Sequence, residues 1–200
     1  MTWIKTIPYE DADPILKKIY NRVKGPDNNV DNILMAHSLR PHTLTGHMML
    51  YKNVLHNSNN TLPKWYLETI GTYVSYLNQC PYCIDHHYTG LRRLLADEEK
   101  SKSIRKAIIE DNLMAVLEEK YGTAIGYIKK LTLEPSSITE EDMATLNVHF
   151  SEGEVLEINQ VVSYFCYANR TVLGLGVTTE GDILGLSPNE SSDPNNWSHQ

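Results

Sequence analysis

The sequence is poor in cysteine and in basic residues, and it contains no long hydrophobic run. Three cysteines in 200 residues are an odd number at low density, which excludes a secreted scaffold held together by several disulfides. Acidic side chains (25) outnumber basic ones (18), and the basic ones form no long run, so we expect no nucleic-acid partner. No apolar stretch approaches the roughly 20 residues of a membrane span, so we expect no membrane partner either.

Chain length and hydrophobic content predict one domain. The N-terminus lacks the longer apolar core of a secretory signal, and we therefore expect a cytoplasmic protein, whose thiols are normally reduced. A chain of 200 residues with 41% hydrophobic content can bury one substantial core, which we assign to residues 1–180. Residues 181–200 end in a stretch rich in Ser, Asn, Pro and Asp and are expected to form a loose polar tail.

Apolar side chains recur at helical spacing along the chain, and no period-two alternation is long enough to predict a strand. Two capping-box patterns, Thr139 with Asp142 and Ser151 with Glu154, mark the starts of two helices. The predicted helices cover residues 11–24, 31–39, 41–55, 63–78, 81–95, 102–118, 121–131 and 151–174. The sequence therefore predicts an all-α fold.

A Cys-x-x-Cys pair carries the strongest chemical signal. Cys80 and Cys83 are three residues apart, and His87 follows Cys83 by four. If Pro81 lies in a first helical turn, Cys83 is near a helix N-terminus, where free N–H groups and the helix dipole favour a thiolate. His87 lies one turn further along the same face and can take the thiol proton, while Cys80 is close enough to form a disulfide with Cys83.

A carboxylate on the preceding helix completes this pattern. Glu68 precedes Cys80 by twelve residues. If the chain reverses at residues 78–81, the two helices run antiparallel, and Glu68 and His87 differ in height by only about 4–5 Å. Glu68 can then hold and polarise His87, which in turn serves Cys83. Small side chains on the same helix face, which would leave room for a pocket, are Gly71, Thr72 and Ser75.

Glu68 and the run Cys80-Pro-Tyr-Cys-Ile-Asp-His-His87 resemble the Glu…Cys-x-x-Cys-x-x-x-His signature of the alkylhydroperoxidase D-like branch of the carboxymuconolactone decarboxylase superfamily. Residues 164–177 are similar to the close of its peroxidase-related members, and the resemblance spans roughly residues 4–177. It implies a compact multi-helix domain with the Cys-x-x-Cys at the start of a helix packed antiparallel to the preceding one. It also implies assembly into a homo-oligomer, a trimer or hexamer.

The resemblance further implies a thiol peroxidase that reduces hydroperoxides and is itself reduced by an external dithiol or thiol protein. Cys83 would be the peroxidatic cysteine, Cys80 the resolving one, and Glu68 with His87 the proton relay. By analogy with thioredoxins, the first cysteine would instead be the nucleophile. The cycle requires no bound organic cofactor and no metal. Some relatives place a histidine just before the second cysteine, where this chain has Tyr82.

Two other interpretations stay open. Cys80, Cys83 and His87 supply three of the four ligands of a zinc site, so the chain could be a zinc-binding module. It could also be a non-catalytic redox sensor, whose disulfide state changes its assembly or its partners. Four further histidines are interpreted as residues that bind no metal: His37, His42, His47 and His56. His86 is interpreted as a solvated or packing neighbour of the site, and Cys166 as a small core residue.

Overall fold

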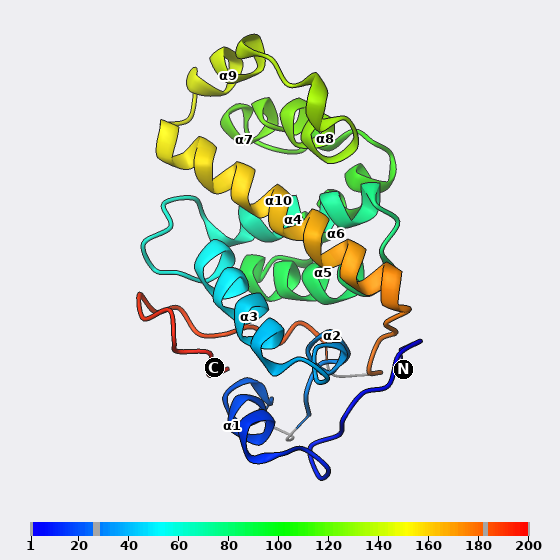
Figure 1. The fold of residues 1–200 in the computed structure, drawn as a ribbon. Coiled ribbons are helices and arrows are strands. Elements are labelled where there is room, and N and C mark those ends of the chain that lie inside the picture. Colours follow the sequence, from blue (N-terminus) through cyan, green and yellow to red (C-terminus); the bar gives the residue numbers. More distant parts are fainter. Residues whose placement is uncertain (1, 26–28, 182–183, 200) are drawn as a thin grey trace.

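The computed structural model describes residues 2–25, 29–181 and 184–199, and over these ranges the chain is helical without any β-strand (Figure 1). This confirms the predicted all-α fold. None of the helices in these ranges is long and apolar enough to cross a membrane. The α-helices are α1 (Pro14–Val23), α2 (Asn32–Ala36), α3 (Pro41–Leu55), α4 (Lys64–Leu77), α5 (Pro81–Leu95), α6 (Glu98–Ile109), α7 (Glu119–Thr123), α8 (Ile125–Leu133), α9 (Glu140–Asn147) and α10 (Glu152–Leu175).

The antiparallel pair of α4 and α5 lies at the centre, and α10 crosses it (Figure 1). Gln79 and Cys80, in the turn between the two helices, reverse the chain direction. Gln79 adopts a left-handed conformation (φ 55°), and the backbone N–H of Cys80 donates to the carbonyl of Ser75 at 2.9 Å. Pro81 then begins α5, where its missing N–H costs no helical hydrogen bond. The predicted chain reversal at 78–81 is thus confirmed.

Helices α7, α8 and α9 form one end of the molecule, and α1 and α2 lie at the other (Figure 1). Both capping boxes are present, at Thr139 before α9 and at Ser151 before α10. The helix predicted over 102–118 instead begins at Glu98 and ends at Ile109, because the chain turns through Asp111 with a positive φ of 52°. A short 3₁₀ turn follows, and the helix predicted over 121–131 is divided into α7 and α8.

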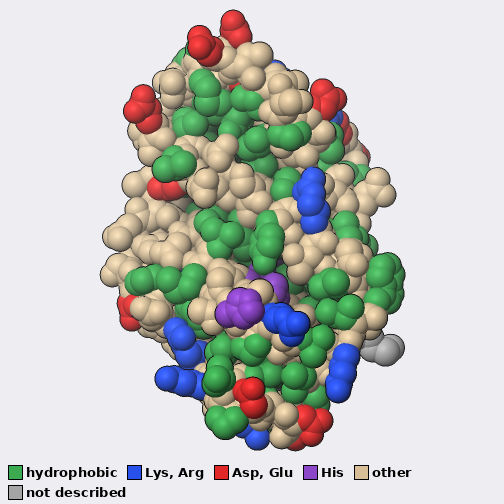
Figure 2. All heavy atoms as spheres, viewed as in Figure 1, with side chains coloured by type: hydrophobic (Ala, Val, Ile, Leu, Met, Phe, Trp, Pro, Cys, Tyr) green, Lys and Arg blue, Asp and Glu red, His purple; other side chains and the backbone are tan. Residues whose placement is uncertain are grey.

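The exposed side of α10 forms much of one face. Figure 2 shows hydrophobic side chains across the middle of this face and acidic side chains mainly at its rim. Leu156, Tyr167 and Leu173 of α10 are among the exposed hydrophobic residues.

The C-terminal segment differs from the expected loose tail. Its residues 188–199 lie against α1 and α3 (Figure 1). Trp197 is 1% exposed, and the Arg22 guanidinium of α1 lies 3.7 Å from the centre of its ring. The buried ammonium of Lys52 in α3 donates to the backbone carbonyl of Asn189. One tryptophan buries enough apolar surface to hold a segment whose composition is otherwise polar.

Gly71 of α4 lies in close contact with α10. A Cβ atom built on Gly71 would lie 2.1 Å from the ring of Phe165. The small side chains on this face of α4 therefore leave room for side chains of α10. At Gly71, the space in which a pocket was expected is filled by Phe165. The missing side chain at position 71 lets α10 pack onto the central pair.

Replacing Gly71→Ala should lower the free energy of unfolding by about 1–3 kcal/mol, because the added methyl group overpacks the contact with Phe165. Urea denaturation measures the change. Gly46→Ala in α3 is the matched control, since nothing lies within 4 Å of its Cβ position, and it should stabilise the protein by about 0.5–1 kcal/mol. Equal, favourable effects of both substitutions would contradict the tight packing at Gly71.

Candidate active site

Cys80 and Cys83 meet at the first turn of α5. Their Sγ atoms lie 3.0 Å apart as free thiols, and both residues are at most 3% exposed. Cys80 occupies the N-cap position, and its carbonyl accepts from the N–H of Ile84. The two sulfurs would need to approach by about 1 Å to form a disulfide, whose S–S bond is about 2.05 Å long.

The two thiols ionise as a pair. The hydrogen bond shared with Cys83 lowers the pKa of Cys80, whereas the same contact and then burial raise the pKa of Cys83 well above its usual value. The pair therefore loses one proton more readily than an isolated thiol does and holds the second more tightly. A proton shift over the short Sγ–Sγ distance can move the single negative charge from one sulfur to the other.

Glu68 and His87 join α4 to α5 beside the thiols. The Nδ1 atom of His87 lies 2.7 Å from Oε2 of Glu68, and the two side chains are 15% and 5% exposed. The predicted contact between these two residues is therefore present. Gly90 of α5 also lies against the Glu68 carboxylate, since a Cβ built on Gly90 would be in van der Waals contact with it at 3.4 Å. If Nδ1–H donates to Glu68, the Nε2 atom of His87 is left to accept a proton.

A cavity of about 50 Å³ lies next to this pair. Cys83, Glu68 and His87 are on its wall, whereas Cys80 is not among the lining residues. Of the two sulfurs, that of Cys83 is thus the one that a small molecule in the cavity would meet. The other lining residues are Asp31, Ile33, Leu34, His47, Met48, Tyr51, Tyr82, His86, Gly90, Tyr164, Ala168, Gly185, Leu186, Ser187 and His199.

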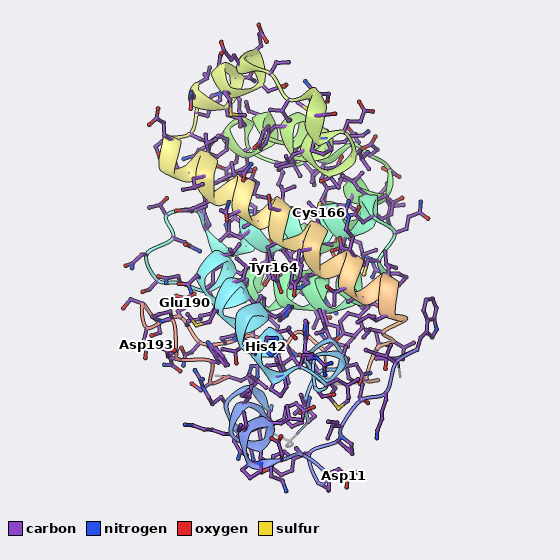
Figure 3. All side chains as sticks on the ribbon, viewed as in Figure 1. Asp11, His42, Tyr164, Cys166, Glu190 and Asp193 are labelled. Carbon is purple, nitrogen blue, oxygen red and sulfur yellow. The ribbon has the colours of Figure 1, made fainter. Side chains whose placement is uncertain are left out.

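Aromatic rings from α3 and α10 form one side of the cavity. The rings of Tyr51 and Tyr164 stack with their centres 5.7 Å apart, and Tyr51 also meets His87 at 6.4 Å. Tyr164 lies between α10 and α3, whereas Cys166 lies on the side of α10 away from α3 (Figure 3). Burial lowers the pKa of His47 to about 3, so this imidazole is neutral at physiological pH. The wall is therefore apolar in character and uncharged on this side.

No pattern in the sequence indicates a role for Glu180, which follows α10. Its carboxylate lies 2.9 Å from Nε2 of His86 and accepts from the Tyr82 hydroxyl at 2.8 Å and from the backbone N–H of Asn32. The rings of Tyr82 and His86 stack with their centres 4.3 Å apart. The start of α5 is thus tied to α2 and to the chain after α10. His86, expected to be a surface or packing residue, is buried on the cavity wall.

A buried amide on α10 supports the Cys-x-x-Cys turn. Asn169 donates to the Ser75 hydroxyl at 3.1 Å and accepts from Nδ2 of Asn78 at 2.9 Å. Asn169 also acts to lower the pKa of both thiols, but it is the weakest of the influences on each, after their shared contact and burial. The resemblance drew attention to this part of α10, although spacing alone gave Asn169 no role.

The other candidate ligands do not gather into a metal site. Within the described residues, no group of three or more His, Cys, Asp and Glu side chains is arranged to hold a metal ion. His87, the third ligand of the zinc interpretation, is engaged with Glu68. Cys166 is partly buried against the core, with Nδ2 of Asn78 at 3.8 Å from its sulfur, and His42 lies at the outer start of α3 (Figure 3).

Comparisons with known proteins bear on the fold. No family model and no curated protein matches the sequence. Among solved structures, an uncharacterized peroxidase-related protein with an alkylhydroperoxidase D core from Ralstonia eutropha JMP134 matches with a TM-score of 0.78 and 17% identity, over 90% of this chain and 93% of that one. A peroxidase-related protein from Silicibacter sp. TM1040 gives 0.76 and 22%, over 90% and 92%.

The debrominase Bmp8 also matches, with a TM-score of 0.71 and 18% identity over 88% of this chain and 91% of that one. These similarities extend over nearly the whole length of each chain, so they concern the complete helical arrangement rather than one hairpin. The chain therefore has the fold of the alkylhydroperoxidase D-like proteins, as the resemblance of its Cys-x-x-Cys segment implied.

Proposed function

We propose that the chain is a thiol peroxidase that reduces hydroperoxides through a dithiol–disulfide cycle of Cys80 and Cys83. One observation carries this proposal. At the start of α5, Cys83 shares one cavity wall with a buried carboxylate–imidazole pair, Glu68 and His87, and the second thiol, Cys80, lies 3.0 Å behind it. Such a site contains a nucleophile, a base to activate it and a second thiol to resolve the oxidised product.

The cycle begins when Cys83 transfers its proton to His87, whose orientation is held by Glu68. The thiolate attacks the terminal oxygen of the peroxide, an S–O bond forms, and the O–O bond breaks as the inner oxygen takes a proton and leaves as the alcohol. The sulfenic acid then condenses with Cys80, which gives a disulfide and water. An external dithiol or thiol protein restores both thiols by exchange, as expected in a reducing cytoplasm.

Cys83 is assigned as the nucleophile because it lines the cavity, although the pair's first ionisation is favoured at Cys80. The two assignments predict different trapped species. With Cys80→Ser, one equivalent of cumene hydroperoxide should leave a sulfenic acid on Cys83 that dimedone captures. The wild-type protein should give a Cys80–Cys83 disulfide by mass spectrometry, and Cys83→Ser should lose peroxidase turnover.

Cys166→Ser is the matched control and should turn over like the wild type, since the third cysteine lies outside the pair. A dimedone adduct on Cys80 in Cys83→Ser, with none in Cys80→Ser, would reverse the two roles. Thiols that stay reduced in the presence of peroxide would contradict the peroxidase proposal. Single-event oxidation with a change in assembly would favour the redox sensor, and stoichiometric zinc would favour the metal module.

Replacing Glu68→Gln preserves the size of the side chain but removes the charge that orients and polarises His87. We expect kcat/KM for hydroperoxide to fall about 10²-fold, since positioned proton transfer contributes factors of this order. The rate of Cys83 alkylation by iodoacetamide should fall with it. Stopped-flow peroxide consumption and alkylation kinetics measure the two effects.

Glu99→Gln on α6 is the control for loss of a carboxylate, because the Glu99 side chain is 90% exposed. It should change neither rate. If Glu68→Gln behaved like Glu99→Gln while the wild type remained an active peroxidase, the relay would be wrong and the dithiol cycle would stand without it.

A second candidate function is thiol-dependent reductive dehalogenation of a small aromatic compound. The aromatic wall of Tyr51 and Tyr164 favours such a ligand. A variant of the structural neighbour Bmp8 is described in complex with 2,3,4-tribromopyrrole. In that reaction two thiols would be oxidised to a disulfide while carbon–bromine is replaced by carbon–hydrogen and bromide is released. Bromide release from this compound, with no consumption of peroxide, would favour the second function.

The proposal includes a homo-oligomer, as the resemblance implies. The exposed residues Leu156, Tyr167 and Leu173 of α10 offer an apolar surface for such contacts. Light scattering of the purified protein gives the number of subunits.

A further inference from the structure

Asp31 occupies an unusual position at the edge of the cavity. It is the N-cap residue of α2, where an aspartate commonly accepts a hydrogen bond from the helix, yet its side chain makes no such bond. It lines the same cavity as Cys83 and His87. Its Oδ1 atom is buried without a hydrogen-bond partner among the described residues. The carboxyl group thus lies on the cavity wall instead of capping α2.

The surroundings of Asp31 determine its charge state. Burial is the largest influence and raises its pKa to about 6, and the negative Glu180 acts in the same direction. His86 and His87 of α5 and His199 of the C-terminal segment oppose this effect. The remaining ionisable groups on the cavity wall are His47, Tyr51, Glu68, Tyr82, Cys83 and Tyr164. Asp31 makes no ion pair among the described residues, so the carboxyl group is available to a ligand.

We propose that Asp31 is the proton donor to the leaving oxygen of the peroxide. This role rests on the proposed peroxidase function and adds a second proton-transfer group to it. His87 and Glu68 take the proton from the attacking thiol, whereas Asp31 supplies one to the oxygen that departs. Two separate groups suit the reaction, because its two proton transfers occur at opposite ends of the S–O–O line of attack.

In this step the Cys83 thiolate attacks the terminal oxygen of ROOH. The S–O bond forms, and the O–O electron pair moves to the inner oxygen. That oxygen takes the proton of the Asp31 carboxyl group and leaves as ROH. Cys83 becomes the sulfenic acid, which keeps the terminal oxygen with its hydrogen, and Asp31 becomes a carboxylate. Water in the open cavity returns a proton to Asp31 before the next turnover.

The test compares two peroxides whose leaving groups differ in basicity. The leaving alkoxide of tert-butyl hydroperoxide needs a proton, whereas the acetate that leaves peracetic acid does not. We expect Asp31→Asn to lower kcat/KM for tert-butyl hydroperoxide about 10²-fold and for peracetic acid by less than about threefold. Asp11→Asn is the control, because Asp11 is exposed and lies far from the cavity (Figure 3).

The pH dependence of the wild-type protein tests the same role without any substitution. The ratio of kcat/KM for tert-butyl hydroperoxide to that for peracetic acid cancels the ionisation of the thiols, which both substrates share. Because only the protonated carboxyl group donates, this ratio should fall as pH rises through about 6, and in Asp31→Asn it should stay flat. Peroxide consumption from about pH 5 to about pH 7.5 covers this transition.

A flat ratio in the wild type would overturn the role of Asp31 while the peroxidase function stands. Equal losses on both substrates in a folded Asp31→Asn protein would do the same, since they would show that Asp31 only shapes the cavity. A wild type that consumes neither peroxide would overturn the proposed function, and the Asp31 proposal with it.

Discussion

Glu68 of α4 and His87 of α5 share a hydrogen bond of 2.7 Å in a place where both side chains are largely buried. A buried carboxylate is costly unless donors satisfy it, and removing one partner of a buried pair leaves the other uncompensated. The two helices must therefore keep the register in which these residues meet. Cys83 lies one helical turn before His87 in α5, so the register that joins Glu68 to His87 also brings Cys83 and Glu68 to the same cavity wall. Phe165 of α10 packs edge-on against the His87 ring with centres 4.5 Å apart.

The parts of this arrangement that follow from local spacing could be predicted from the sequence. Cys83 and His87 share a face because they are four residues apart in one helix, and Pro81 fixes where that helix begins. Once the chain reverses after Asn78, the distance from Glu68 to His87 follows from the rise of an α-helix. The reversal itself includes Gln79, whose positive φ has no strong signal in its side chain.

The rest of the site depends on contacts between residues that are distant in the chain. Glu180 meets His86 across 94 residues, and Asn169 meets Ser75 across the same separation. Single buried polar side chains of this kind leave no periodic pattern, since their positions follow from how whole helices pack. The C-terminal segment shows the same limit. Its polar composition indicates a loose tail, whereas the burial of Trp197 and the contact of Lys52 with Asn189 hold it against the helices.

The uncharged wall of the cavity restricts where charge can reside during a reaction. Tyr51 and Tyr164 have pKa values raised well above the usual range by burial, and His47 is kept neutral, so none of the three carries a charge at physiological pH. Negative charge on the thiol pair is shared by two sulfurs, and the amide of Asn169 stabilises it. In the proposed cycle, an alkoxide leaving beside the Tyr51–Tyr164 wall would meet no charged partner on that side, and an isolated ion in an apolar environment is strongly disfavoured. Proton transfer to the leaving oxygen would therefore accompany O–O cleavage, and its source would be a titratable group elsewhere on the cavity wall, such as Asp31.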